Sequence, residues 1–150
     1  MLLASLPACP QGRAYALAGR PGIFFYPMAL LRFVLWTQAT YILITAVWPL
    51  LDIDSFMQVT GYKTDIWLVK TVGALLIPIA ATLYMHLFIR TDHRPAIALG
   101  SLTAFAFIFI DLYYSFNDVI SDIYLADALV EFFFLIFWLL VAFSRKVIGH

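Results

Sequence analysis

Four ionisable side chains lie inside long apolar stretches of the sequence: Lys70, Asp111, Asp127 and Glu131. If these stretches cross a bilayer, a charged carboxylate facing lipid at its centre would cost on the order of 2.5 to 3.5 kcal/mol. Lys70 can extend its four-carbon stem towards water, but the shorter carboxylates must face protein, water or a cation. One lysine cannot neutralise three carboxylates. Either some of them hold a proton, or the site takes up a cation, an amine or water.

The spacing of the carboxylates places them on inward-facing helix surfaces. Asp127 and Glu131 are four residues apart, so on a helix they stack on one face, which also carries Tyr124. Asp111 continues a row of small residues at the helical spacing that lets membrane helices approach closely. That row consists of Ala96, Gly100 and Ala104. Because neighbouring spans run antiparallel, we expect the charged parts to meet at the same depth.

These faces predict an outward-facing polar site within the membrane. The expected residues are Glu131 at the centre, Asp127 and Asp111 beside it, Lys70 as the counter-charge, and Tyr124 and Tyr114 as sources of hydroxyl groups. Such a site would bind a small amphipathic or cationic ligand, or relay protons.

Two other interpretations use the same residues. In the first, the protein is a membrane-embedded enzyme whose carboxylates act as general acid and base on a lipid or isoprenoid. In the second, it is a structural or accessory subunit of a membrane complex. Its charges would then pair with a partner's helices, or with one another in an ion network that fixes the register of the helices.

The sequence lacks the motifs of several common activities. It has no glycine-rich phosphate loop and no Gly-x-Ser-x-Gly nucleophile motif. Cys9 is the single cysteine, which excludes an intramolecular disulfide and a cysteine-based zinc site. The histidines form no metal-ligand motif such as His-x-x-Glu-His. We therefore predict no cofactor and no metal site, and the formal net charge of zero argues against a nucleic-acid partner.

The elements that must position this site are four apolar helices. Hydrophobic residues make up 64% of the 150 residues and charged residues 12%, which is unlike a soluble domain. At about 1.5 Å per residue, each apolar stretch can cross a hydrocarbon core of about 30 Å. A membrane β-barrel is disfavoured, because its strands would be shorter and would alternate in polarity. The prediction is an all-α polytopic membrane protein, an antiparallel four-helix bundle with spans at about 30–51, 66–89, 95–116 and 123–144.

The loops between these stretches also predict four separate membrane helices. Residues 90–94 predict a tight turn before a helix that begins near Pro95. Residues 117–122 are rich in turn-forming side chains and predict a second turn. In the longer first loop, residues 53–59 predict a short interfacial helix that ends at Gly61.

The basic residues predict the orientation, since segments on the cytoplasmic side retain Lys and Arg. Seven of the nine basic residues flank the N-terminus, the 90–94 turn or the C-terminus, and eight of the nine acidic residues lie towards the other side. The expected topology has both termini in the cytoplasm. We expect a multi-pass protein of the cell membrane, such as a bacterial inner membrane. It would contact lipid and could form a homo-oligomer or bind a partner membrane subunit.

Residues 1–27 differ from the rest of the chain. Seven proline and glycine residues interrupt a helix there, which predicts a flexible cytoplasmic tail that also contains arginine. The regular apolar pattern begins at Met28, so Met28 is an alternative translation start. The expected membrane domain is residues 28–150.

The predicted orientation can be tested by labelling. In a Cys9→Ser background, a cysteine in place of Asp118 should react with a membrane-impermeant maleimide added to intact cells, whereas one in place of Thr91 should not. Both should react once the membrane is permeabilised, which controls for burial. Labelling at position 91 alone in intact cells would mean that the orientation is the opposite one.

Overall fold

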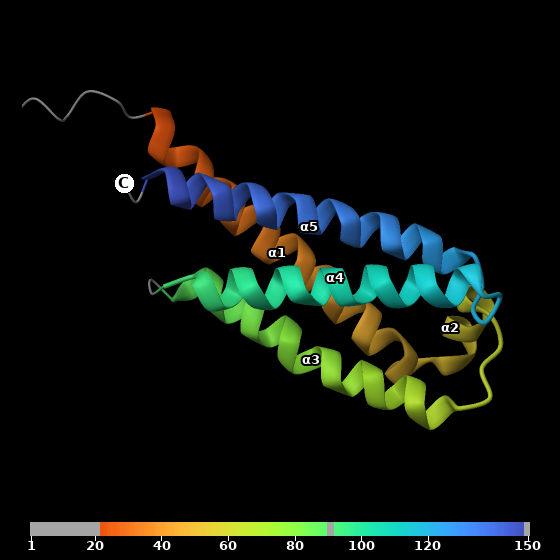
Figure 1. Cartoon of the computed structure of the whole chain (residues 1–150). Coiled ribbons are helices and arrows are strands. Elements are labelled where there is room, and N and C mark those ends of the chain that lie inside the picture. The colour runs from red at the N-terminus through yellow and green to blue at the C-terminus, as the bar shows by residue number, and fades with distance from the viewer. Residues whose placement is uncertain (1–21, 90–91, 149–150) are drawn as a thin grey trace, which may run out of the picture.

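A computed structural model of the chain describes residues 22–89 and 92–148, with side chains for residues 28–89 and 92–144. Within these residues the chain forms five helices and no strand. The helices are α1 (Gly22–Leu51), α2 (Ile53–Thr60), α3 (Ile66–Phe88), α4 (Arg94–Phe116) and α5 (Ile123–Ile148). All but α2 are long and apolar enough to cross a membrane. The protein is therefore an all-α, multi-pass membrane protein built as a four-helix bundle, as predicted (Figure 1).

The helix boundaries agree with the predicted spans to within a few residues, except at the start of α1. This helix begins at Gly22, inside the segment assigned to the tail from sequence. Pro27 does not prevent this, because it removes only one backbone hydrogen bond and about one helical turn precedes it. The rest of the predicted tail, residues 1–21, lies outside the described residues.

The short helix predicted in the first loop is α2. The Asp52 carboxylate caps its start by accepting a hydrogen bond from the Ser55 backbone N–H at 3.0 Å. This hydrogen bond lowers the pKa of Asp52 below its ordinary value. The helix ends at Gly61, whose φ of 90° lies in the left-handed region that favours glycine. Phe56 and Thr60 are buried, so α2 packs against one end of the bundle.

The four long helices form a ring in which neighbours run antiparallel. α1 packs most extensively on α3, and α4 on α5, while α1 also contacts α5. α3 and α4 follow one another along the chain but make far fewer contacts with each other. In Figure 1 these two helices lie close together at one end and diverge towards α2. We call the end of the bundle that carries α2 and the α4–α5 turn the α2 end.

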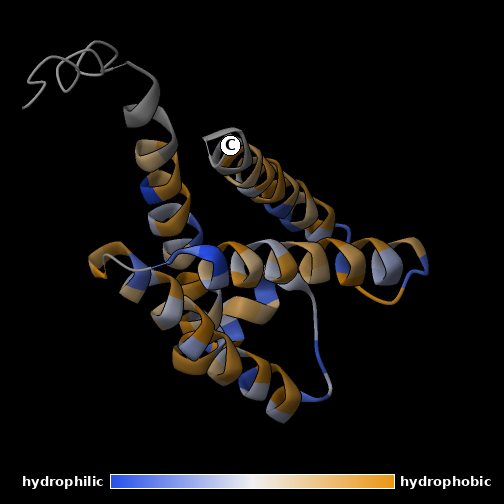
Figure 2. Ribbon diagram, turned by 60° about the vertical axis from the view of Figure 1, so that its left-hand side comes forward, coloured by the Kyte–Doolittle hydropathy of each residue, from blue (hydrophilic) through white to orange (hydrophobic). Residues whose placement is uncertain are grey.

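Hydrophobic residues occupy most of the length of the four long helices (Figure 2), and many of their large side chains are exposed on the outside of the bundle. On α4, for example, Leu102, Phe105 and Phe109 are each more than half exposed. An apolar surface of this extent would associate in water, but it matches the hydrocarbon interior of a bilayer. The outer faces of these helices are therefore in contact with membrane lipid.

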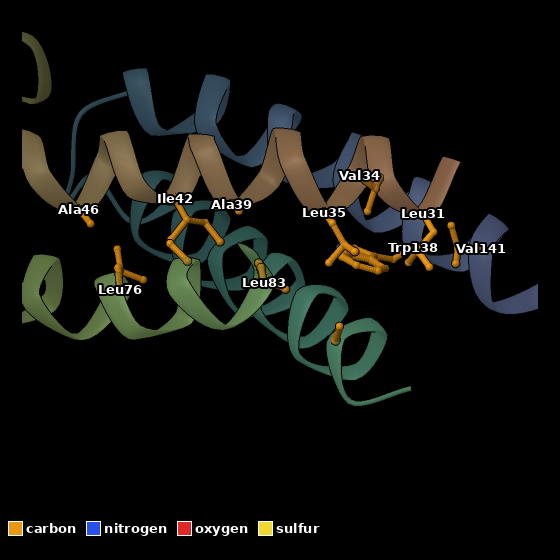
Figure 3. Packing of buried hydrophobic residues seen from close by; sticks show 12 residues of the cluster. Leu31, Val34, Leu35, Ala39, Ile42, Ala46, Leu76, Leu83, Trp138 and Val141 are labelled. Carbon is orange, nitrogen blue, oxygen red and sulfur yellow. The ribbon is translucent and has the colours of Figure 1, made fainter. Parts of the chain in front are cut away.

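The buried core is one cluster that runs along α1 (Figure 3). Towards the α2 end, Ala39, Ile42 and Ala46 of α1 lie beside Leu76 and Leu83 of α3, and towards the other end Leu31, Val34 and Leu35 of α1 lie beside Trp138 and Val141 of α5. A hydrogen bond of 2.6 Å between the Thr40 and Tyr84 hydroxyl groups adds a polar contact to the first interface. α1 thus holds both halves of the bundle together.

Two glycines permit the closest helix contacts. A Cβ atom at Gly73 of α3 would lie 2.6 Å from the backbone oxygen of Ala46 in α1. A Cβ atom at Gly100 of α4 would overlap the indole ring of Trp138 in α5. The predicted row of small residues on α4 is buried, which confirms that this face is a packing surface.

Gly100→Ala should destabilise the bundle, because the added methyl group has no space beside the Trp138 ring. Overpacking of this kind costs about 1 to 3 kcal/mol, which chemical unfolding of the purified protein in detergent would detect. Ala98→Val, which adds volume on the exposed face of the same helix, is the control. Equal stability of Gly100→Ala and the wild type would mean that α4 and α5 pack less closely than described.

Candidate functional site

A cavity of about 350 Å³ lies near the α2 end, on the side of the bundle where α3 and α4 diverge. All five helices contribute to its lining, and most of the lining residues are apolar. The polar groups belong to Thr45, Lys63, Asp111, Tyr114, Tyr124 and Asp127. Apolar walls with a few convergent polar groups are typical of a small-molecule site.

Asp111 and Asp127 form an acidic pair in the cavity wall, close enough for a hydrogen bond between their carboxyl groups. Asp111 is only 3% exposed, and no N–H or hydroxyl group of the described residues donates a hydrogen bond to its Oδ2 atom. Asp127 accepts a hydrogen bond from the Tyr41 hydroxyl group. The tyrosine thus orients Asp127, while one oxygen of Asp111 is buried without a donor from an N–H or hydroxyl group of the described residues.

Glu131 lies one helical turn beyond Asp127, outside the cavity lining, and is 1% exposed. Gln38 Nε2 donates to Glu131 Oε2 at 3.4 Å and to the Gly100 carbonyl at 3.1 Å. Trp138 Nε1 donates to Gln38 Oε1 at 2.7 Å. Since an indole N–H can only donate, this contact fixes the orientation of the Gln38 amide. A single buried side chain of α1 therefore ties α4 and α5 together.

Lys63, in the loop between α2 and α3, supplies a cation to the cavity. Its Nζ atom lies 4.9 Å from the centre of the Tyr124 ring, within the range of a cation–π contact. The same ammonium group donates a hydrogen bond to the Thr60 backbone carbonyl at 3.2 Å. Burial lowers the pKa of Lys63, because the loss of water disfavours its charged form.

The structure brings most of the predicted site residues together. Asp111, Tyr114, Tyr124 and Asp127 all line the cavity. Glu131, expected at the centre of the site, lies behind this lining and contacts Gln38 instead. Lys70, the expected counter-charge, is half-buried, lies outside the lining and forms no ion pair with any carboxylate in the described residues. α3 turns its Gly73 and Leu76 face towards the cavity, and Lys70 lies beside this face.

Three residues of the site were not singled out from sequence: Gln38, Tyr41 and Lys63. Gln38 is the one amide side chain within the predicted spans, a signal that could have identified it, because such groups hydrogen-bond between membrane helices. Tyr41 lies three residues further along the same helix. Nothing in the sequence indicated that Lys63 would lie at the cavity, because its place in space depends on how the α2–α3 loop folds.

The arrangement is suited to binding an organic cation. Two aspartates and the tyrosine Tyr124 line a space of about 350 Å³ with mainly apolar walls, which is much larger than a bare metal ion needs. In the described part of the chain, no three histidine, cysteine, aspartate or glutamate side chains are grouped to hold a metal.

Comparison with known proteins gives no match to a protein family, a curated protein or a solved structure.

Replacing the Gln38 amide should destabilise the bundle without enlarging the side chain. Gln38→Met leaves the Trp138 N–H and the Glu131 carboxyl group without their buried partner, at a cost of about 1 to 3 kcal/mol. Chemical unfolding in detergent measures the loss. Gln58→Met, an exposed position on α2, is the matched control and should change stability by about 0.5 kcal/mol or less. Similar effects of the two substitutions would rule out a structural role for the Gln38 network.

Proposed function

We propose that the protein binds a small amphipathic cation in the cavity near its α2 end. The observation that carries this proposal is the acidic pair of Asp111 and Asp127 in the wall of a mainly apolar cavity, where no N–H or hydroxyl group of the described residues donates to Asp111 Oδ2. A buried polar atom without a partner costs about 1 to 3 kcal/mol. A ligand that brings a positive charge or a donor to this atom removes that cost.

The charge balance of the site supports a cationic ligand. Asp111, Asp127 and Glu131 interact electrostatically, so they repel one another when ionised. Among the described residues, Lys63 is the one cation in the cavity lining, and its ammonium group contacts the Tyr124 ring rather than a carboxylate. Lys63 therefore does not neutralise the carboxylates. A ligand cation next to the acidic pair would reduce the repulsion between them.

The apolar walls support an amphipathic ligand. Leu68 and Val72 of α3, and Phe107 and Ile110 of α4, are among the apolar residues that line the cavity. A hydrated ion would gain nothing from these side chains, whereas each buried methylene group of an alkyl chain contributes about 0.8 kcal/mol. The cavity volume of about 350 Å³ fits a small head group with part of its chain.

The predicted orientation places this site on the outer side of the cell membrane. With both termini in the cytoplasm, α2 and the α4–α5 turn face outwards, and the cavity lies just below that surface. In a bacterial inner membrane, the ligand would then come from the periplasmic side or from the outer leaflet.

Asp127→Asn should weaken the binding of octylammonium to the protein in nanodiscs at least tenfold. The substitution removes a negative charge from the cavity wall but keeps an oxygen to accept the Tyr41 hydrogen bond. Titration calorimetry against empty nanodiscs measures the affinity. Asp122→Asn, an exposed carboxylate near the start of α5, is the matched control and should bind as the wild type does. Glu131→Gln should have a smaller effect than Asp127→Asn, because Glu131 does not line the cavity.

The same titration with octyl sulfate tests the sign of the ligand charge. The proposal requires that octyl sulfate bind no better to the protein than to empty nanodiscs. Equal affinities of the wild type and Asp127→Asn for octylammonium would refute it. So would chemical conversion of bound lipid detected by mass spectrometry, which would favour the enzymatic interpretation instead.

A further inference from the structure

The Lys63 ammonium group lies against an aromatic ring and makes few hydrogen bonds with the protein. It lies over the Tyr124 ring at 4.9 Å and keeps a single hydrogen bond, to the Thr60 carbonyl. A primary ammonium has three N–H donors, so two of them find no acceptor among the described residues. A cation without N–H groups would lose nothing at this position.

The surroundings of the Tyr124 ring are those of a site for a substituted ammonium. An aromatic face attracts a positive charge without any directional hydrogen bond, and it is the usual protein partner of quaternary ammonium groups. The acidic pair of Asp111 and Asp127 lines the same cavity and adds long-range attraction. The remaining walls are mainly apolar, which suits the methyl groups of such a cation.

We propose that the ligand is an amphiphile with a quaternary ammonium head group, which binds on the Tyr124 ring in place of the Lys63 ammonium group. This inference rests on the proposed function and adds the chemical class of the ligand and the residue with which it competes. Lys63 is then a tethered cation that occupies the site when the ligand is absent.

Lys63 is held loosely enough to be displaced. It lies in the loop between α2 and α3, two residues after Gly61, and it forms no ion pair with a carboxylate in the described residues. Burial lowers the pKa of Lys63, which means that its charged form is less favourable here than in water. An ammonium group that moves out of the cavity regains its hydration, and this offsets the loss of the Tyr124 contact.

The chain of the amphiphile has a route to the membrane. Four lining residues are exposed at the bundle surface, two from α3 and two from α4: Leu68, Val72, Ile110 and Tyr114. The cavity therefore reaches the outside between these two helices, which make few contacts with each other. A head group at Tyr124 can leave its alkyl chain between α3 and α4, in contact with lipid.

The experiment measures the binding of octyltrimethylammonium to the protein in nanodiscs, with empty nanodiscs as the blank. The neutral analogue, in which carbon replaces the quaternary nitrogen, separates charge recognition from apolar burial. The wild type should bind the cation at least fivefold more tightly than the analogue. Lys63→Gln should raise the affinity for the cation at least threefold, because it removes the competing ammonium group.

Tyr124 provides the second arm of the test. Tyr124→Leu should weaken the binding of octyltrimethylammonium about fivefold, whereas Tyr124→Phe, which keeps the ring, should leave it unchanged. Tyr62→Leu, at an exposed position in the α2–α3 loop, and Arg94→Gln, which removes a positive charge at the other end of the bundle, are the matched controls. Neither control should alter the affinity.

Each contrary outcome has a distinct meaning. If Lys63→Gln leaves the affinity unchanged or weakens it, Lys63 does not compete with the ligand, and the inference fails. If the neutral analogue binds as well as the cation, or Tyr124→Leu has no effect, the ring does not recognise a quaternary ammonium. Asp127-dependent binding of octylammonium would then still support the proposed function. If neither octylammonium nor octyltrimethylammonium binds above the blank, the proposed function fails as well.

Discussion

A polar group inside a bilayer has no water to bind, so the protein must supply its partner, and this constraint shapes the whole bundle. Gln38 illustrates it most clearly. Its amide accepts from Trp138 and donates to Gly100 and Glu131, so one side chain of α1 fixes the positions of α4 and α5. The apolar contacts around it can be made only when these helices are in register. The hydrogen bonds thus select one arrangement among many apolar ones.

Glycine decides how closely the helices approach and hence where space remains. At Gly73 and Gly100 the absence of a Cβ atom lets α3 meet α1 and lets Trp138 of α5 lie against α4. α3 and α4 have no comparable contact near the α2 end, and they diverge there. The pairs α1–α3 and α4–α5 pack tightly, whereas α3 and α4 pack loosely against each other. The cavity lies on this loosely packed side.

The chemistry of the cavity follows from which groups this geometry leaves unsatisfied. Glu131 is enclosed and has Gln38 as its partner, whereas Asp111 keeps an unpartnered oxygen in the cavity wall. Lys63 reaches the same space but contacts the Tyr124 ring instead of a carboxylate. A buried acidic pair, an aromatic face and apolar walls together favour a ligand that is both cationic and apolar.

The sequence was enough to predict the number of membrane helices, their approximate bounds except at the start of α1, the short helix α2, and a shared site for Asp111, Asp127, Tyr114 and Tyr124. Apolar length and helical spacing carry this information, because they depend on residues close together in the chain. The tertiary structure alone decided that Lys63 lies at the cavity, that Lys70 lies outside it, and that Gln38 holds Glu131. These outcomes depend on the rotation of each helix about its axis and on the path of a loop. Both are set by contacts between residues far apart in the sequence, such as Gly100 with Trp138 and Tyr41 with Asp127.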